Sequence, residues 1–289
     1  MRRERWWVPY AYLAPAVALF GTFLLYPLAR SVQYSLYSWD GLTESTFVGF
    51  ANYADVLGDP DLRAAFGHAL VLIGFFSLLP LAIGLLLAAV LNRGRVHGLG
   101  LFRTVVFLPQ VIAMVVVAVA WRQIYAPDGA LNTALRAVGL DQLARSWLGD
   151  YTWALPAVGM VGTWVQTGLV TVLLLAGMAR LPREQYEAAR LDGAGAVREF
   201  FSLTLPAIRP EIAVALTLTI VAALKTFDLV YVTTGGGPGT STTVPAYEVF
   251  QRAFRQGAVG SAAAIAVTLT ALIFGINVIV RRVVDRGEQ

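Results

Sequence analysis

Residues 181–206 read LPREQYEAARLDGAGAVREFFSLTLP and lie between two long apolar segments. A polar, helix-forming stretch in such a place belongs outside lipid, because charged side chains are costly inside a bilayer. Its small residues allow another backbone to come close: Ala188, Ala189, Gly193, Ala194 and Gly195. Charged residues surround them: Glu184, Glu187, Arg190, Asp192, Arg198 and Glu199. Such a surface suits docking onto another protein.

The composition of the whole chain is that of an integral membrane protein. Of its 289 residues, 57% are hydrophobic and only 14% are charged, whereas soluble domains carry roughly 25% charged residues. There is no cysteine, which excludes disulfides and thiol chemistry. The net charge of +4 comes almost entirely from arginine. These arginines lie where membrane topology would place them, so the positive charge does not indicate nucleic-acid binding. We predict no nucleic-acid partner.

Six segments are long and apolar enough to cross a bilayer, which takes about 20 residues in a helix. They are residues 11–29, 69–91, 104–125, 155–178, 212–232 and 261–280. Since lipid offers no partner for backbone groups, the segments must be helices. The first could be mistaken for a secretory signal, but it is long and lacks a clear A-x-A site, so we expect an uncleaved span. The predicted fold class is all-α, a polytopic membrane protein with six transmembrane helices.

Arginines predict the orientation of these spans. They gather in the N-terminal tail, in the connection after the second span, in residues 180–210 and at the C-terminus. The positive-inside rule places these segments in the cytoplasm. We therefore predict that both termini are cytoplasmic (N-in, C-in), and that residues 181–206 face the compartment that contains ATP.

The polar stretch closely resembles the EAA loop of ATP-binding-cassette (ABC) importer permeases. Four pieces of that pattern occur in order: Glu187-Ala188-Ala189, Asp192-Gly193-Ala194, Phe200, and Leu205-Pro206 after Thr204. The resemblance implies that these residues couple the permease to an ATPase. The alternative is an amphipathic surface helix without a special role.

Further stretches resemble the carbohydrate-uptake permeases of this family, such as those of the maltose and glycerol-3-phosphate systems. They include Tyr10 to Pro15, Leu131-Asn132, and Phe227-Asp228 with Thr234 to Pro238. The resemblance implies a MetI-like permease fold in a prokaryotic plasma membrane. The resemblance implies two parts of the chain. Residues 1–65 hold the N-terminal tail, the first span and an extracytoplasmic loop. Residues 66–289 form the permease core of five spans, with the coupling loop at residues 180–210.

We expect no enzyme activity in this chain. A P-loop needs G-x-x-x-x-G-K-[ST], and the single lysine, Lys225, follows Ala-Ala-Leu inside a predicted span. We predict no bound metal or cofactor in this chain. We expect membrane lipid to surround the spans. The resemblance implies two ABC ATPase subunits that bind ATP and magnesium, a second permease that is usually a different chain, and an extracytoplasmic substrate-binding protein.

Candidate substrate-pathway residues are polar or aromatic side chains within the spans. Lys225 and Asp228 lie three residues apart, so a continuous helix would place them on one face; a structural pair near the outer interface is the alternative. Trp164 and Gln166 provide an aromatic ring and an amide, which suit a sugar and suit helix packing equally well. Two further candidates are as ambiguous: Tyr231 and Asn277.

Two other functions remain open at this stage. One is an ABC permease for a different small solute, such as glycerol phosphate, a polyamine or a phosphonate. The other is an ion-coupled secondary transporter, for which inverted repeats or interrupted helices would be expected. The polar loop would have no explanation in a secondary transporter. The prediction is therefore a sugar-importing permease subunit that works by alternating access.

Overall fold

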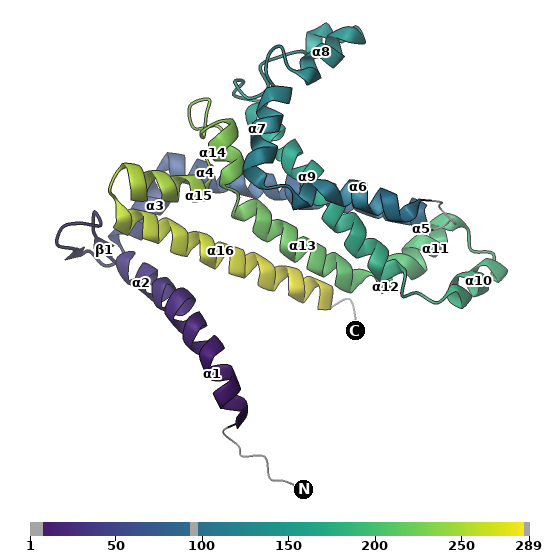
Figure 1. The fold of residues 1–289 in the computed structure, drawn as a ribbon, viewed down its shortest axis with the longest axis horizontal. Helices are drawn as coiled ribbons and strands as arrows, with labels where there is room; N and C mark the ends of the chain where they lie inside the picture. Colours follow the sequence, from purple (N-terminus) through teal and green to yellow (C-terminus); the bar gives the residue numbers. More distant parts are fainter. Residues whose placement is uncertain (1–7, 93–97, 286–289) are drawn as a thin grey trace. The chain divides into compact units, whose positions relative to one another are not determined.

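The computed structural model describes residues 8–92 and 98–285, and helices dominate this part of the chain (Figure 1). The arginines at positions 2, 3, 5, 93, 95 and 286 lie outside the described residues. Two compact units are present. The first comprises residues 1–60 and 248–270, and the second comprises residues 61–247 and 271–289.

The first unit begins with a helix that is continuous with the next through a π-helical turn. Its elements are α1 (Val8–Phe20), η1 (Gly21–Leu25), α2 (Tyr26–Tyr34), β1 (Tyr37–Ser38), β2 (Thr46–Phe47), α3 (Ala51–Gly58), the end of α15 (Pro245–Phe250), η5 (Gln251–Arg255) and the first part of α16 (Val259–Asp285). The two strands pair antiparallel. Gly260 packs on the backbone of this strand segment, where its N–H donates to the carbonyl oxygen of Trp39 at 3.1 Å.

The second unit contains the long apolar helices and their connections. Its elements are α4 (Pro60–Ile73), η2 (Gly74–Leu78), α5 (Leu79–Asn92), α6 (Leu99–Val111), α7 (Met114–Ile124), α8 (Ala130–Ala137), η3 (Asp141–Leu143), α9 (Ala154–Met178), α10 (Arg183–Leu191), α11 (Ala196–Glu199), η4 (Phe200–Thr204), α12 (Leu205–Ala207), α13 (Arg209–Leu224), α14 (Asp228–Thr233) and the remainder of α15 and α16.

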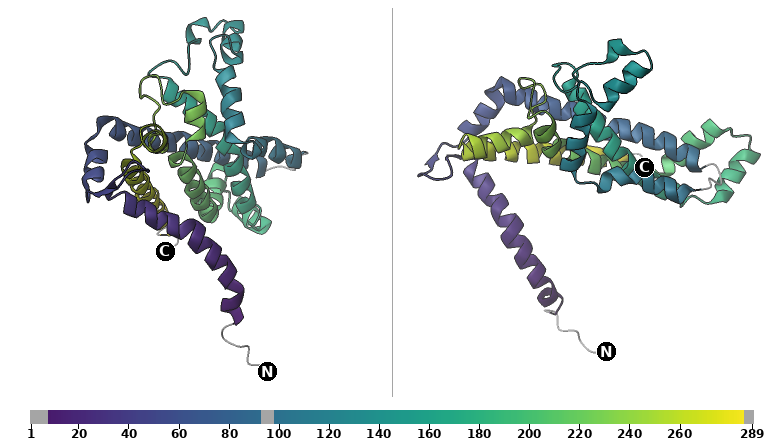
Figure 2. Two further views of the ribbon diagram at one scale, coloured as in Figure 1. Left: turned by 60° about the vertical axis from the view of Figure 1, so that its left-hand side comes forward. Right: turned by 45° about the horizontal axis from the view of Figure 1, so that its top comes forward.

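Helix α9 is the core of the second unit and packs against α5, α6, α13 and η2. Glycines on α9 let these neighbours come close. A Cβ atom at Gly162 would lie 2.0 Å from the ring of Phe76, and one at Gly168 would lie 2.1 Å from the carbonyl oxygen of Val106. Beyond one end of α9, α10 and α11 form a polar hairpin, whereas α7, α8 and α14 lie at the other end (Figures 1 and 2).

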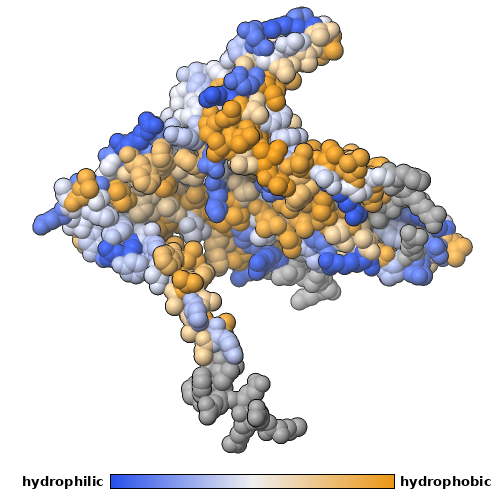
Figure 3. Space-filling model, in the orientation of Figure 1, coloured by the Kyte–Doolittle hydropathy of each residue, from blue (hydrophilic) through white to orange (hydrophobic). Residues whose placement is uncertain are grey.

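The surface of the second unit has the polarity expected of a membrane protein. Apolar residues cover α6 and α7, and hydrophilic residues gather on α8 and around α10 (Figure 3). In the described ranges, four helices are long and apolar enough to cross a membrane, or up to six if each of two bent pairs forms one span. The fold is therefore an all-α, polytopic membrane fold. The number of six spans and the N-in, C-in orientation stay predictions.

Two of the predicted spans are not continuous helices. In the third, α6 and α7 meet at 96°, because Ile112 and Ala113 adopt extended conformations. Pro109, in the last turn of α6, cannot donate a helical hydrogen bond and so weakens the helix there. The fifth predicted span, 212–232, ends early, since α13 stops at Leu224 and residues 225–227 are not helical.

The close contact at Gly168 gives a prediction about stability. We expect Gly168→Ala to destabilise the protein by about 1–3 kcal/mol, because the added methyl group would meet the backbone of α6, which must shift. Gly67→Ala is the matched control, since a Cβ atom there has no neighbour within 4 Å. Thermal unfolding of both variants in detergent measures the difference. Equal melting temperatures for Gly168→Ala and the unchanged protein would contradict this account of the packing.

Candidate functional site

The polar hairpin consists of α10, a tight turn and the short helical pieces α11, η4 and α12. Gly193 has a φ of +78°, a left-handed conformation that glycine adopts without steric cost. The N–H of Ala194 donates to the carbonyl oxygen of Ala189 at 2.9 Å. The N–H of Gly193 donates to the carbonyl oxygen of Arg190 at 3.0 Å. These two bonds form a Schellman motif, a common way to end a helix. The Asp-Gly-Ala piece of the sequence thus encodes a helix stop.

Three nested polar contacts join the descending and ascending arms of the hairpin. At its base, Arg180 Nη1 lies 3.0 Å from Glu211 Oε1. In the middle, the hydroxyls of Tyr186 and Thr204 are 2.9 Å apart. Near the tip, Arg190 Nε donates to Glu199 Oε1 at 2.9 Å.

The ion pair near the tip is more important for geometry than for stability. The Glu199 side chain is 7% exposed and that of Arg190 is 59% exposed, so solvent screens the pair and its attraction contributes little to stability. The hydrogen bond to Glu199 raises the pKa of Arg190 from its usual value. Arg190 also lies in the last turn of α10 and Glu184 in the first, where each charge complements the helix dipole.

The sequence-predicted coupling residues fall into two groups. The first group is exposed, at the tip of the hairpin: Glu187, Ala188, Asp192 and Gly193. The second group is half-buried and anchors the hairpin: Ala189, Ala194, Phe200, Leu205 and Pro206. Phe200 packs against the buried cluster that contains Met178 and Ile208. The pattern therefore combines a surface with the residues that hold it in place.

The polar hairpin also carries exposed apolar side chains that the sequence pattern did not identify. Leu191 is 89% exposed, Val197 is 70% exposed and Phe201 is 60% exposed. All three lie in the polar hairpin rather than on the apolar helices. An apolar group surrounded by charges outside lipid is typical of a surface that binds another protein.

The hairpin leads directly into α13. The helical pieces of its ascending arm meet α13 at 68°, and Ile208 at this bend is fully buried. The carboxylate of Glu211, in the first turn of α13, packs against Gly177 of α9. A displacement of the hairpin would therefore act on the ends of both α9 and α13.

The second candidate region contains the predicted substrate-pathway residues. Gln166 on α9 is 4% exposed, and its Oε1 atom has no hydrogen-bond partner in the described part of the chain. The expectation that Lys225 and Asp228 share a helical face is wrong, because the helix breaks between them: Lys225 follows the last residue of α13, and Asp228 begins α14. Both side chains are exposed.

The remaining candidates lie in separate settings. Tyr231 belongs to an aromatic group in which its ring centroid is 5.3 Å from that of Phe227 and 6.3 Å from that of Tyr247. Asn277 donates to the carbonyl oxygen of Ile273 within its own helix at 2.8 Å. Its Oδ1 atom is buried and has no partner among the residues described.

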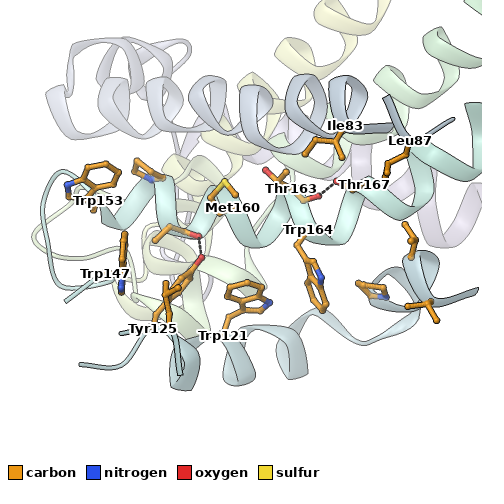
Figure 4. Close-up of a pocket in the computed structure, with 16 residues that line it drawn as sticks. Ile83, Leu87, Trp121, Tyr125, Trp147, Trp153, Met160, Thr163, Trp164 and Thr167 are labelled. Carbon is orange, nitrogen blue, oxygen red and sulfur yellow. Dashed lines mark hydrogen bonds between the residues drawn. The ribbon is translucent and has the colours of Figure 1, made fainter. Parts of the chain in front are cut away.

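Trp164 lines an elongated pocket that sequence reasoning missed. The pocket has a volume of about 720 Å³. In Figure 4 its residues extend from Trp153 and Trp147 at one end, past Trp121 and Trp164, to Ile83 and Leu87 at the other. The full lining comprises Ile83, Leu87, Val105, Val106, Pro109, Trp121, Tyr125, Leu131, Trp147, Trp153, Pro156, Ala157, Met160, Thr163, Trp164 and Thr167.

Comparisons with known proteins agree with this architecture. The chain is 36% identical to the diacetylchitobiose uptake system permease protein NgcF of Streptomyces coelicolor, over 96% of this chain and 83% of that protein. It is 32% identical to the lactose transport system permease protein LacF of Rhizobium radiobacter, over 84% and 82% of the two chains. A chain in the crystal structure of a bacterial alginate ABC transporter with its alginate-bound periplasmic protein has the same fold, with a TM-score of 0.83, 24% identity and 98% coverage of both chains.

The family comparison covers most of the second unit and the whole polar hairpin. Residues 80–287 match the family model described as binding-protein-dependent transport system inner membrane component. The match takes in α9, the hairpin and α13, the elements on which the candidate site is built. The chain therefore belongs to the family of inner membrane components of binding-protein-dependent transport systems.

Proposed function

We propose that this chain is the transmembrane permease subunit of an ATP-driven importer that moves a sugar or a sugar-like solute into a prokaryotic cell. As an inner membrane component with several apolar helices, it is a multi-pass protein of the plasma membrane and a transport subunit. The relatives NgcF and LacF carry the names of a diacetylchitobiose and a lactose transport system. These names support a carbohydrate as the solute.

The observation that carries the proposal is the exposed, internally braced hairpin that continues into α13. We assign its tip, with Glu187, Ala188, Asp192 and Gly193, as the surface that docks on a separate ATPase. The exposed side chains of Leu191 and Val197 support this assignment, since they offer apolar contact area outside lipid. Two such ATPase subunits would bind the ATP and magnesium, so this chain itself would need no cofactor.

The rest of the assembly follows from the same proposal. A second permease, of a different sequence, would complete the transmembrane pathway, and an extracytoplasmic binding protein would deliver the solute. Docking of the ATPase would move the hairpin, and the hairpin would move α9 and α13, which alternates access to the pathway between the two sides. Docking of a cytoplasmic ATPase on the hairpin requires the predicted N-in, C-in orientation.

Transport by the purified assembly tests the proposed function. We expect the tagged chain, extracted gently from its native membrane, to bring with it an ATPase, a second permease and a binding protein. In proteoliposomes the assembly should take up labelled solute only with ATP and the binding protein. The binding protein can be screened by calorimetry against diacetylchitobiose, lactose and sn-glycerol 3-phosphate. Uptake that needs an ion gradient and no ATP would identify a secondary transporter instead.

A substitution at Gly193 tests the coupling role of the hairpin. We expect Gly193→Val to reduce the solute transported per ATP hydrolysed several-fold while leaving membrane insertion intact. The left-handed conformation costs an L residue about 1–2 kcal/mol, and a β-branched residue tolerates it poorly, so the hairpin tip would change shape.

Two controls separate conformation from bulk in this experiment. Gly193→Asn should retain coupling, because asparagine adopts the left-handed conformation more readily. Gly195→Val adds the same side chain at a position with a φ of −76° and no neighbour within 4 Å, so it tests the effect of bulk at the docking surface without strain in the backbone. Normal uptake by Gly193→Val would refute the assigned role.

We assign Gln166 as the best supported of the pathway candidates, because a buried amide oxygen without a partner is costly unless it serves a ligand or water. Asn277 also has such an oxygen, but its side chain is only half-buried and its amide nitrogen is already bonded within its own helix. Lys225, Asp228, Tyr231, Asn277 and Trp164 stay as further candidates. Trp164 lines the apolar pocket and is 42% exposed, so it has the weakest support as a contact for a hydroxyl-rich solute.

Transport kinetics test the assignment of Gln166. We expect Gln166→Leu to raise the KM for solute uptake about tenfold, the loss expected when a buried hydrogen bond to a ligand is removed. Met160→Leu, also on α9, is the conservative control and should leave KM unchanged. If Gln166→Leu transports with the original KM, the pathway does not use this amide.

A further inference from the structure

The pocket beside Trp164 offers very few free hydrogen-bonding groups. Among its lining hydroxyls, Thr163 Oγ1 donates to the carbonyl oxygen of Phe75 at 2.6 Å and Thr167 Oγ1 donates to that of Thr163 at 2.7 Å. The hydroxyl of Tyr125 donates to the carbonyl oxygen of Ala157 at 3.2 Å (Figure 4). A sugar requires several placed polar partners, so this pocket suits a hydrocarbon better than a carbohydrate.

One end of the pocket is organised by Asn132, whose side chain is almost fully buried. Its Nδ2 donates to the carbonyl oxygen of Arg145 at 2.8 Å, and its Oδ1 accepts from the N–H of Arg145 at 3.2 Å. The same Oδ1 accepts from the indole Nε1 of Trp147 at 2.9 Å. Asn132 thus fixes an arginine and a pocket-lining tryptophan side by side.

Arg145 brings a positive charge to this end of the pocket. Its guanidinium lies 4.7 Å from the ring centroid of Trp153 and 5.4 Å from that of Trp147, both of which line the pocket. Its Nε donates to the carbonyl oxygen of Leu143 at 3.1 Å. Within residues 8–92 and 98–285, no carboxylate forms an ion pair with Arg145. The terminal nitrogens of Arg145 are therefore available to an anion.

The length of the pocket matches the depth of one leaflet. The helical rise from Trp153 to Thr167 corresponds to about 21 Å. Half of the hydrocarbon core is about 15 Å deep, and the polar headgroup region adds several Å. Tryptophan and arginine are the residues expected at the headgroup level. A cation at one end and an apolar channel of this length together resemble the two parts of a phospholipid.

We propose that this pocket binds a phospholipid, with the phosphate on Arg145 and one acyl chain beside Met160 and Trp164. The phosphate forms charge-assisted hydrogen bonds with the guanidinium, which is held by its two tryptophan neighbours. The acyl chain fills the space between α9 and α6. The unpaired charge of Arg145 favours a lipid over an apolar helix of a second chain, which would leave the guanidinium without a partner.

Native mass spectrometry of the assembled transporter tests the proposal. The complex is stripped of lipid and titrated with 1-palmitoyl-2-oleoyl-phosphatidylglycerol. We expect Arg145→Gln to weaken the tightest phospholipid binding about tenfold or more, since a charge-assisted hydrogen bond contributes at least that factor. Val105→Trp should also weaken it, because it places a ring in the pocket from a position that is 59% exposed. Arg145→Lys should restore most of the binding.

Matched controls show whether a loss of phospholipid binding comes from the contact between the phosphate and Arg145. Arg136→Gln removes an arginine of the same connection that already pairs with Asp128 at 3.9 Å, and should bind the lipid as the unchanged protein does. A diacylglycerol with the same chains lacks the phosphate and should bind no better to the unchanged protein than to Arg145→Gln. Displacement of the lipid by equimolar inorganic phosphate would show an anion site only and overturn the proposal.

A photoreactive side chain excludes the other occupant. In native membranes, Met160→p-benzoylphenylalanine should form an adduct with the mass of a phospholipid. An adduct with a second polypeptide would show that a neighbouring helix fills the pocket. Retention of the phospholipid by both Arg145→Gln and Val105→Trp at the affinity of the unchanged protein would also overturn the proposal. None of these outcomes depends on whether the transported solute is a sugar.

Discussion

The close packing of α9 is the constraint on which the rest of the second unit depends. In lipid, helices gain little from hydrophobic burial against one another, so they associate through tight contact and interhelical polar bonds. Gly159 and Gly162 receive the rings of Phe75 and Phe76, and Gly168 receives the backbone of α6. Near the end of α9, Gly177 receives the carboxylate of Glu211. The same packing that holds the core together therefore also positions the base of the hairpin.

The hairpin shows how a sequence motif corresponds to a physical device. Asp192-Gly193-Ala194 ends a helix by backbone hydrogen bonding, and Ala189 supplies the acceptor. Phe200 anchors the returning arm in the buried cluster below. Local chemistry of this kind can be read from the sequence, because each interaction spans only a few residues. The predicted all-helical membrane fold and the family were confirmed.

Other features depend on contacts between distant residues, and the sequence did not reveal them. The bend after Pro109 could have been suspected from the proline, but the break at Lys225 has no comparable signal. The partners of Arg180 and Arg190 are glutamates 31 and 9 positions away, and only the fold shows which ones they are. The pocket combines residues from α5, α6, α7 and α9 with those of the connection that contains Arg145. Asn132 belonged to a recognised motif, yet its role appears only in three dimensions.

The hairpin and α13 form a lever with unequal arms. From the bend at Ile208, the ascending arm of the hairpin, Ala196–Ala207, reaches about 18 Å and α13 about 24 Å, at 1.5 Å per residue. The nested contacts tie the two arms of the hairpin together, and the buried Ile208 lies at the bend, where a rigid hairpin would turn. A movement of the tip would then be enlarged by about a third at the far end of α13. This gain in displacement would turn a small movement at the membrane surface into a larger movement within the bilayer.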